Sequence, residues 1–135
     1  MVLKRIYICA FALAVCGVLY AAETFEEYQA VMRAGAGANG EMRKLIESDL
    51  NGAAAAAERV KTAFGELEAY WKAKGATDAV TFAHNVVTAA EQVRAAAAAG
   101  NKEAAAAASQ SIGANCSGCH EAHRVRNADG TFQIK

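Results

Sequence analysis

Proline is absent from this chain of 135 residues, and alanine is abundant. Three uninterrupted runs of five alanines occur, at 53–57, 95–99 and 104–108. Alanine has the highest intrinsic helix propensity, whereas proline interrupts helices. Short segments containing Gly and Asn divide the chain into four stretches, and helices joined by short loops pack as antiparallel neighbours. We therefore predict an all-α fold, an antiparallel four-helix bundle.

Capping and punctuation residues set the predicted boundaries. Thr24 and Glu27 form a capping box at the start of the first helix, and Gly75 ends the second. The predicted helices span about 24–49, 53–73, 78–99 and 102–126. The apolar stripes expected to face the core are Ala56, Val60, Phe64, Leu67 and Trp71 in the second helix, and Phe82, Ala83, Val86, Val87, Ala90 and Val93 in the third. His84 lies off its stripe and is predicted to be a surface residue.

Three glycines, Gly35, Gly37 and Gly40, lie within the first predicted helix. Each costs about 1 kcal/mol relative to alanine in a helix, so the cluster needs an explanation. Two remain open. The glycines either mark a break between two shorter helices, or their missing side chains let a flat cofactor approach the backbone.

Residues 1–22 have the pattern of a secretory signal peptide. Lys4 and Arg5 form the basic region, an apolar stretch covers residues 6–20, and Ala21 and Ala22 supply a small-residue cleavage site. Cleavage after either alanine is compatible with the pattern. We therefore predict export to a bacterial periplasm.

Two alternatives to simple cleavage would keep the protein at the membrane: an uncleaved anchor, or a lipid attached to Cys16. The apolar stretch is shorter than the about 20 residues of a comfortable span, and Val15 is large for a lipoprotein processing site. A membrane partner is therefore expected only if the N-terminal segment is retained.

The remaining chain, residues 23–135, is predicted to be one domain. Removal of Lys4 and Arg5 changes the balance from 14 basic and 14 acidic residues to 12 and 14. This slight negative charge does not favour a nucleic-acid partner. Cys116 and Cys119 become the only thiols, which excludes a framework of structural disulfides.

Residues 116–120 read Cys-Ser-Gly-Cys-His, the CxxCH attachment sequence of a c-type haem. Two thiols at this spacing can add to the two vinyl groups of one porphyrin, and His120 can then ligate the iron. On a helix, Cys116, Cys119, His120 and His123 share one face, which predicts a haem against the bundle interior. The same four residues are also a complete zinc set, although structural zinc sites usually draw their ligand pairs from separate elements. A redox-active disulfide is the third possibility, but its usual βαβ context is missing.

The ending CSGCHEAHR, from Cys116 to Arg124, resembles the C-terminus of the class II cytochromes c, the cytochrome c-prime family. Members of that family are four-helix bundles with one haem near the C-terminus. The resemblance implies that Arg124 lies near the proximal histidine, where it tunes that ligand or pairs with a haem propionate. His123 departs from the aromatic residue usual in the family.

A second segment, Tyr28 to Arg33 followed by Asn39-Gly40, is similar to the first helix of the low-spin members. In those proteins a methionine at the position of Met32 is the sixth iron ligand, and Met42 is the alternative in this chain. The resemblance implies a periplasmic electron carrier rather than an enzyme, with one haem c and with donor and acceptor proteins as partners. If the sixth position is open, it implies instead a five-coordinate protein that binds nitric oxide or carbon monoxide. Many members of the family form homodimers, so a dimer is also possible here.

Overall fold

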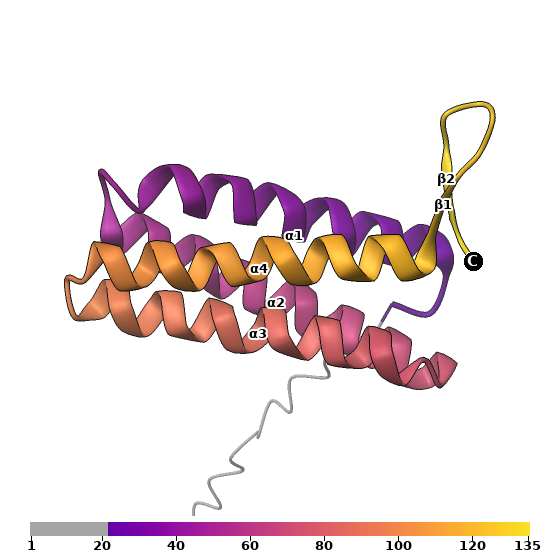
Figure 1. Ribbon diagram of the computed structural model, residues 1–135, viewed down its shortest axis with the longest axis horizontal. Coiled ribbons are helices and arrows are strands. Elements are labelled where there is room, and N and C mark those ends of the chain that lie inside the picture. Colours follow the sequence, from indigo (N-terminus) through magenta and orange to yellow (C-terminus); the bar gives the residue numbers. More distant parts are fainter. Residues whose placement is uncertain (1–21) are drawn as a thin grey trace, which may run out of the picture.

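The structure, a computed structural model, describes residues 22–135 as four helices and two short strands (Figure 1). The elements are α1 (Phe25–Leu45), α2 (Leu50–Lys74), α3 (Thr77–Ala98), α4 (Lys102–His123), β1 (Arg124–Arg126) and β2 (Phe132–Ile134). Successive helices run in opposite directions, so α1 begins at the end of the bundle where α4 finishes. Helix α1 packs on α2, α2 on α3 and α3 on α4, whereas α1 and α4 barely touch. The predicted all-α four-helix bundle is confirmed.

Side-chain caps fix the helix starts. The predicted capping box is present, because Glu27 N–H donates to Thr24 Oγ1 (3.2 Å) and Thr24 N–H donates to Glu27 Oε2 (3.0 Å). Helix α2 begins three residues earlier than predicted, since Asp49 accepts a hydrogen bond from the backbone N–H of Gly52 at 2.9 Å. Gly75 ends α2 with a φ of 72°, a left-handed conformation that glycine adopts without strain.

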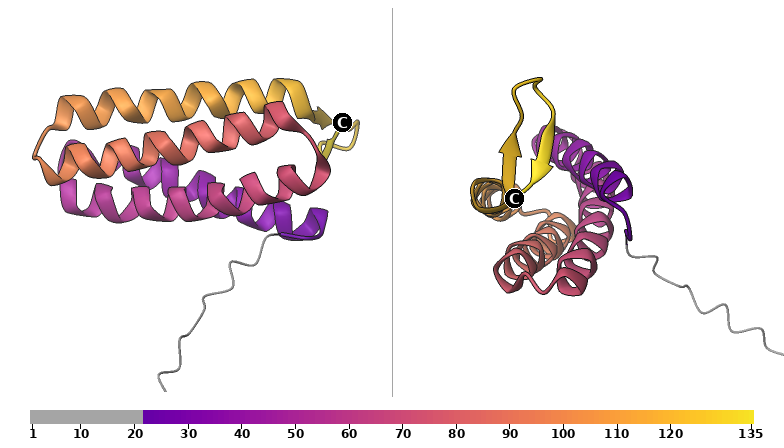
Figure 2. Two further views of the ribbon diagram at one scale, coloured as in Figure 1. Left: turned by 90° about the horizontal axis from the view of Figure 1, so that it is seen from below. Right: turned by 90° about the vertical axis from the view of Figure 1, so that its right-hand side faces the viewer.

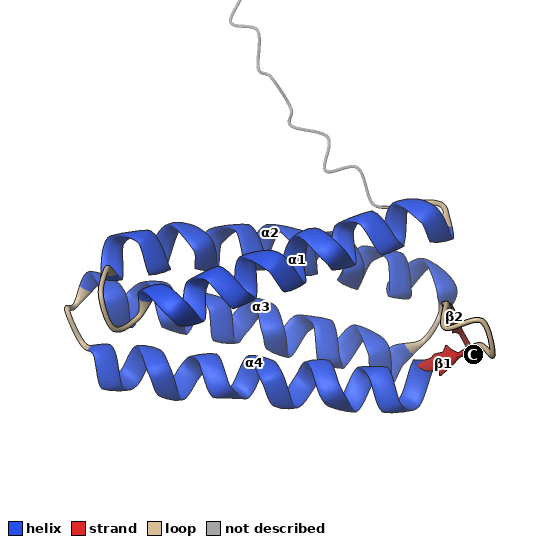
Figure 3. Cartoon of the chain, turned by 90° about the horizontal axis from the view of Figure 1, so that it is seen from above, coloured by secondary structure: helices blue, strands red, loops and turns tan. Residues whose placement is uncertain are grey.

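The prediction that the fourth helix reaches Arg126 is wrong. Helix α4 ends at His123, and β1 pairs with β2 as an antiparallel hairpin that stands at this end of the bundle (Figures 2 and 3). The turn between the strands contains Asp129-Gly130, with Gly130 at a φ of 88°. An Asp-Gly pair is a turn signal, and it allows the chain after α4 to reverse and pair with itself.

The predicted apolar stripes form the core. The stripe of α2 is buried throughout, and in α3 all members are buried except Phe82 and Val87, which are half-buried. His84 is confirmed as a surface residue, with 63% of its side chain exposed and Nδ1 lying 3.4 Å from Glu68. The packing therefore follows the helical period of the sequence.

Helix α1 continues without interruption through its glycines, which excludes a break between two shorter helices. A Cβ at Gly35 would lie 3.1 Å from the Phe64 ring and 3.2 Å from Ala63 Cβ. Gly35 therefore allows α2, not a cofactor, to approach the backbone of α1. Gly37 and Gly40 face open space, where a Cβ would meet no atom within 4 Å.

Gly37→Ala is expected to stabilise the protein by about 0.5–1 kcal/mol, because alanine is the better helix former and its Cβ meets nothing here. The matched variant Gly35→Ala gains the same propensity but presses against Phe64, and overpacking costs about 1–3 kcal/mol. Urea unfolding should therefore rank Gly37→Ala above Gly35→Ala. Equal gains would contradict tight packing between α1 and α2.

The predicted signal peptide lies outside the described residues, apart from Ala22. Within residues 22–135, no helix combines the length and the apolar character needed to cross a bilayer.

Candidate functional site

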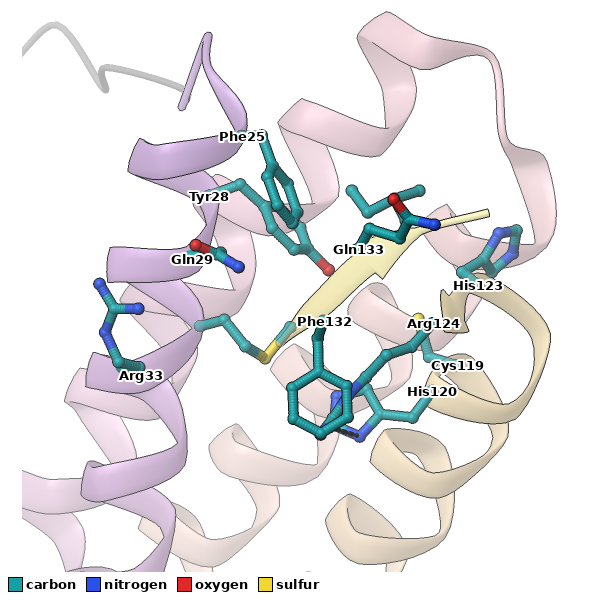
Figure 4. A pocket seen from close by; sticks show the side chains of 12 residues that line it. Phe25, Tyr28, Gln29, Arg33, Cys119, His120, His123, Arg124, Phe132 and Gln133 are labelled. Atoms are coloured by element: carbon teal, nitrogen blue, oxygen red, sulfur yellow. Dashed lines mark hydrogen bonds between the residues drawn. The ribbon is translucent and has the colours of Figure 1, made fainter. Parts of the chain in front are cut away.

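A cavity of about 280 Å³ lies between the start of α1, the end of α4 and the hairpin (Figure 4). It occupies the side of the bundle where α1 and α4 do not pack against each other. A smaller, inner cavity of about 20 Å³ is partly lined by Phe64, Leu67 and Val86 of the core. Met32, Cys119 and His120 line both cavities, so the two form one site.

The structure brings the residues of the predicted site together. Cys119, His120, Arg124 and Met32 line the outer cavity, and Cys116 lines the inner one. Met32 belongs to α1 and the others to α4 and its C-terminal cap, so the site is built from opposite ends of the sequence. The alternative residue Met42 is fully buried in the core and lines neither cavity.

Close packing between α3 and α4 explains the glycine inside the CxxCH sequence. A Cβ at Gly118 would lie 2.7 Å from Cε1 of Phe82, closer than two carbon atoms can approach. Phe82 also lines the inner cavity. The glycine therefore lets the Phe82 ring pack beside the two cysteines.

Both cysteines are half-buried free thiols. Burial raises the pKa of Cys116, and burial together with the nearby Cys116 raises the pKa of Cys119 to about 11. Reactive redox cysteines have the opposite property, a pKa lowered by positive surroundings. The environment therefore does not favour the redox-active disulfide.

Arg124 contacts His120 directly, with Nη1 lying 3.2 Å from Nδ1. A guanidinium only donates hydrogen bonds, so Nδ1 is the acceptor in this contact and the ring hydrogen is on Nε2. Burial, followed by the charge of Arg124, lowers the pKa of His120. The neutral imidazole is therefore favoured, which is the form that binds metals.

His123 also lines the outer cavity, but its imidazole is paired with a residue of α3. Its Nε2 lies 2.8 Å from Asp78 Oδ2, and its ring lies 4.9 Å from that of Trp71. The hydrogen bond from His123 lowers the pKa of Asp78. In residues 22–135 no three His, Cys, Asp or Glu side chains are grouped so that they could hold a metal ion. The zinc alternative is therefore not supported by the geometry.

One residue of the cavity lining belongs to a buried cluster of three aromatic side chains. Tyr28 lines the cavity and packs against Tyr70 (4.5 Å between ring centroids) and Trp71 (5.6 Å). All three residues are at least 93% buried, and burial raises the pKa of Tyr28. Arg33 and Arg124 are the lining residues with a permanent charge, and no carboxylate lines either cavity. An apolar space with cationic groups on its lining suits an apolar ligand that carries carboxylates.

The sequence pattern does not reveal the contribution of the hairpin, because it predicts a helix to Arg126 and no further element after it. Phe132, Gln133 and Ile134 line the outer cavity. The Asp129-Gly130 turn was the available signal. Comparisons with protein-family models, curated proteins and solved structures find no match to this chain.

Proposed function

We propose that the protein is a periplasmic monohaem c-type cytochrome that carries single electrons between a donor and an acceptor protein. One observation carries the proposal: Cys116, Cys119 and His120 of α4 line the same inner cavity as Met32 of α1. CxxCH alone is a short motif, whereas this arrangement supplies two thiols, an imidazole and a thioether around one space. Those are the groups that tether and ligate a c-type haem.

The residues present fit such a group. Cys116 and Cys119 would hold it through their half-buried thiols, and His120 and Met32 would ligate its iron from α4 and α1. Both ligands come from well-packed helices rather than loops, which favours fixed ligand positions. When bound, the haem supplies a one-electron Fe(III)/Fe(II) couple, and a methionine ligand raises its reduction potential.

Buried aromatic side chains would keep water away from the inner side of the site. The cluster of Tyr28, Tyr70 and Trp71 closes the cavity on the side of α2, and Phe82 fills the space beside the cysteines. A dry environment disfavours the additional charge of the oxidised state. These aromatic residues therefore act in the same direction as Met32 on the potential.

The proposal is tested by expressing the full chain in bacteria that possess a cytochrome c maturation system, and recording absorption spectra of the periplasmic protein. We expect a c-type spectrum that survives extraction with acidified acetone, and a mass increase of one haem. Low-spin spectra in both oxidation states would support His/Met ligation. High-spin spectra with rapid binding of carbon monoxide would favour the gas-binding alternative, and a chain without covalent haem would exclude both.

A further inference from the structure

The C-terminal hairpin is held against the site at several points. Residues 124–126 pair with residues 132–134, and the turn is closed by a hydrogen bond from Asn127 N–H to the carbonyl of Thr131 (2.8 Å). Lys135 N–H donates to the carbonyl of His123 at 3.0 Å, which ties the end of the chain to the end of α4. Isolated two-stranded hairpins are marginally stable, so packing against the bundle is needed to hold this one. The half-buried side chain of Ile134 packs against the core and provides it.

Phe132 and Arg124 lie on opposite strands of the hairpin, and their side chains meet beside His120 (Figure 4). The guanidinium carbon of Arg124 lies 3.5 Å from the centre of the Phe132 ring, a close cation–π stack. The same guanidinium reaches Nδ1 of His120 at 3.2 Å. Arg124 is therefore shared between the ring of Phe132 and the imidazole.

These two contacts differ in what they require of His120. Donation from Arg124 to Nδ1 needs a lone pair on Nδ1, and coordination of a metal through Nε2 places the ring hydrogen on Nδ1 instead. The stack on Phe132 does not depend on that hydrogen. The stack can therefore keep Arg124 beside His120 whether the ring hydrogen of His120 is on Nε2 or on Nδ1.

The placement of Phe132 distinguishes it from the other exposed phenylalanine of the described chain. Phe25 has nearly the same exposure, 38% against 37%, but its ring stacks on Tyr28. The Phe132 ring instead stacks on the guanidinium of Arg124, the group that reaches His120. Its contact with the guanidinium is therefore the more specific feature of Phe132.

We propose that Phe132 is a positioning residue of the site, whose ring holds the positive charge of Arg124 beside His120. This inference rests on the proposed cytochrome function. A positive charge near a redox centre favours the reduced state, which carries one positive charge less. Phe132 therefore raises the reduction potential through Arg124, and the hairpin is part of the redox site.

Spectroelectrochemical titration of the haem-loaded full chain tests this inference. Phe132→Leu is expected to lower the midpoint potential, and Phe132→Trp, which keeps an aromatic face, to restore it to near the unmodified value. Arg124→Gln should lower the potential at least as much as Phe132→Leu. The double variant should then match Arg124→Gln alone, because Phe132 acts through the arginine.

Arg126→Gln is the matched control, because it removes a positive charge from the same hairpin at a residue that does not line the cavity. Arg126 also lies further from the Phe132 ring, at 5.8 Å, so a much smaller shift is expected. An unchanged potential in Phe132→Leu, or an equal further drop when it is added to Arg124→Gln, would overturn the positioning role while leaving the cytochrome function intact. Absence of covalent haem from the unmodified protein would overturn both.

Discussion

Alanine at both Cys116 and Cys119 is expected to abolish covalent haem attachment and to leave the four-helix bundle folded. The thiols are the groups that add to the porphyrin vinyls, so no other residue of the described chain can form the links. Both side chains are half-buried, and removal of each sulfur costs about 1 kcal/mol, partly offset by the higher helix propensity of alanine. Mass spectrometry of denatured periplasmic protein should show the mass of the bare chain, while circular dichroism still reports a helical protein.

Three single variants separate covalent attachment from folding. Cys116→Ala and Cys119→Ala each keep one thiol and should retain haem through a single link, at lower yield. Ser117→Ala changes an exposed residue between the cysteines and should retain haem fully. If the double variant carried as much covalent haem as the unmodified protein, the assignment of residues 116–120 as the attachment sequence would be wrong.

The helices were predictable because their determinants are local. Thr24 with Glu27 and Gly75 act on backbone groups within a few residues, and the apolar stripe of α2 follows one helical period. The end of the fourth helix was wrongly predicted at Arg126, because a non-local interaction determines where that helix ends. Pairing of residues 124–126 with 132–134 competes with continuation of α4. Helix propensities describe local preferences only, so they do not include the stabilisation that this pairing provides.

The site likewise has one part that spacing within a helix predicts and another part that depends on tertiary packing. Spacing within one helix placed Cys116, Cys119 and His120 on a common face, and the structure agrees. The position of Met32 in the same cavity depends on the separation of α1 from α4, which the family resemblance implied and composition did not. The stack of Phe132 on Arg124 depends on the pairing of residues 124–126 with 132–134, and a helix predicted to continue to Arg126 excludes that pairing.

Met32→Leu is expected to convert a low-spin six-coordinate iron into a high-spin five-coordinate one. Leucine nearly conserves the volume of methionine and costs less than about 1.5 kcal/mol, but it has no thioether to offer the metal. Met32 is half-buried on α1 and lines both cavities, so no backbone change is needed to accommodate leucine. Absorption spectra of the ferric protein should lose the charge-transfer band of methionine ligation, the reduction potential should fall, and carbon monoxide should bind the ferrous protein.

Met42→Leu provides the matched control, since it makes the same chemical change on the same helix at a fully buried position outside the cavities. It should cost a similar or larger amount of stability and leave the haem spectrum unchanged. If Met42→Leu removed the low-spin spectrum and Met32→Leu did not, Met42 would be the iron ligand instead of Met32. That outcome would require α1 to rotate about its axis so that Met42 faced the cavity. If the unmodified protein and both variants were equally high-spin, Met32 would line the cavity without ligating the iron. The gas-binding function would then replace the proposed electron transfer.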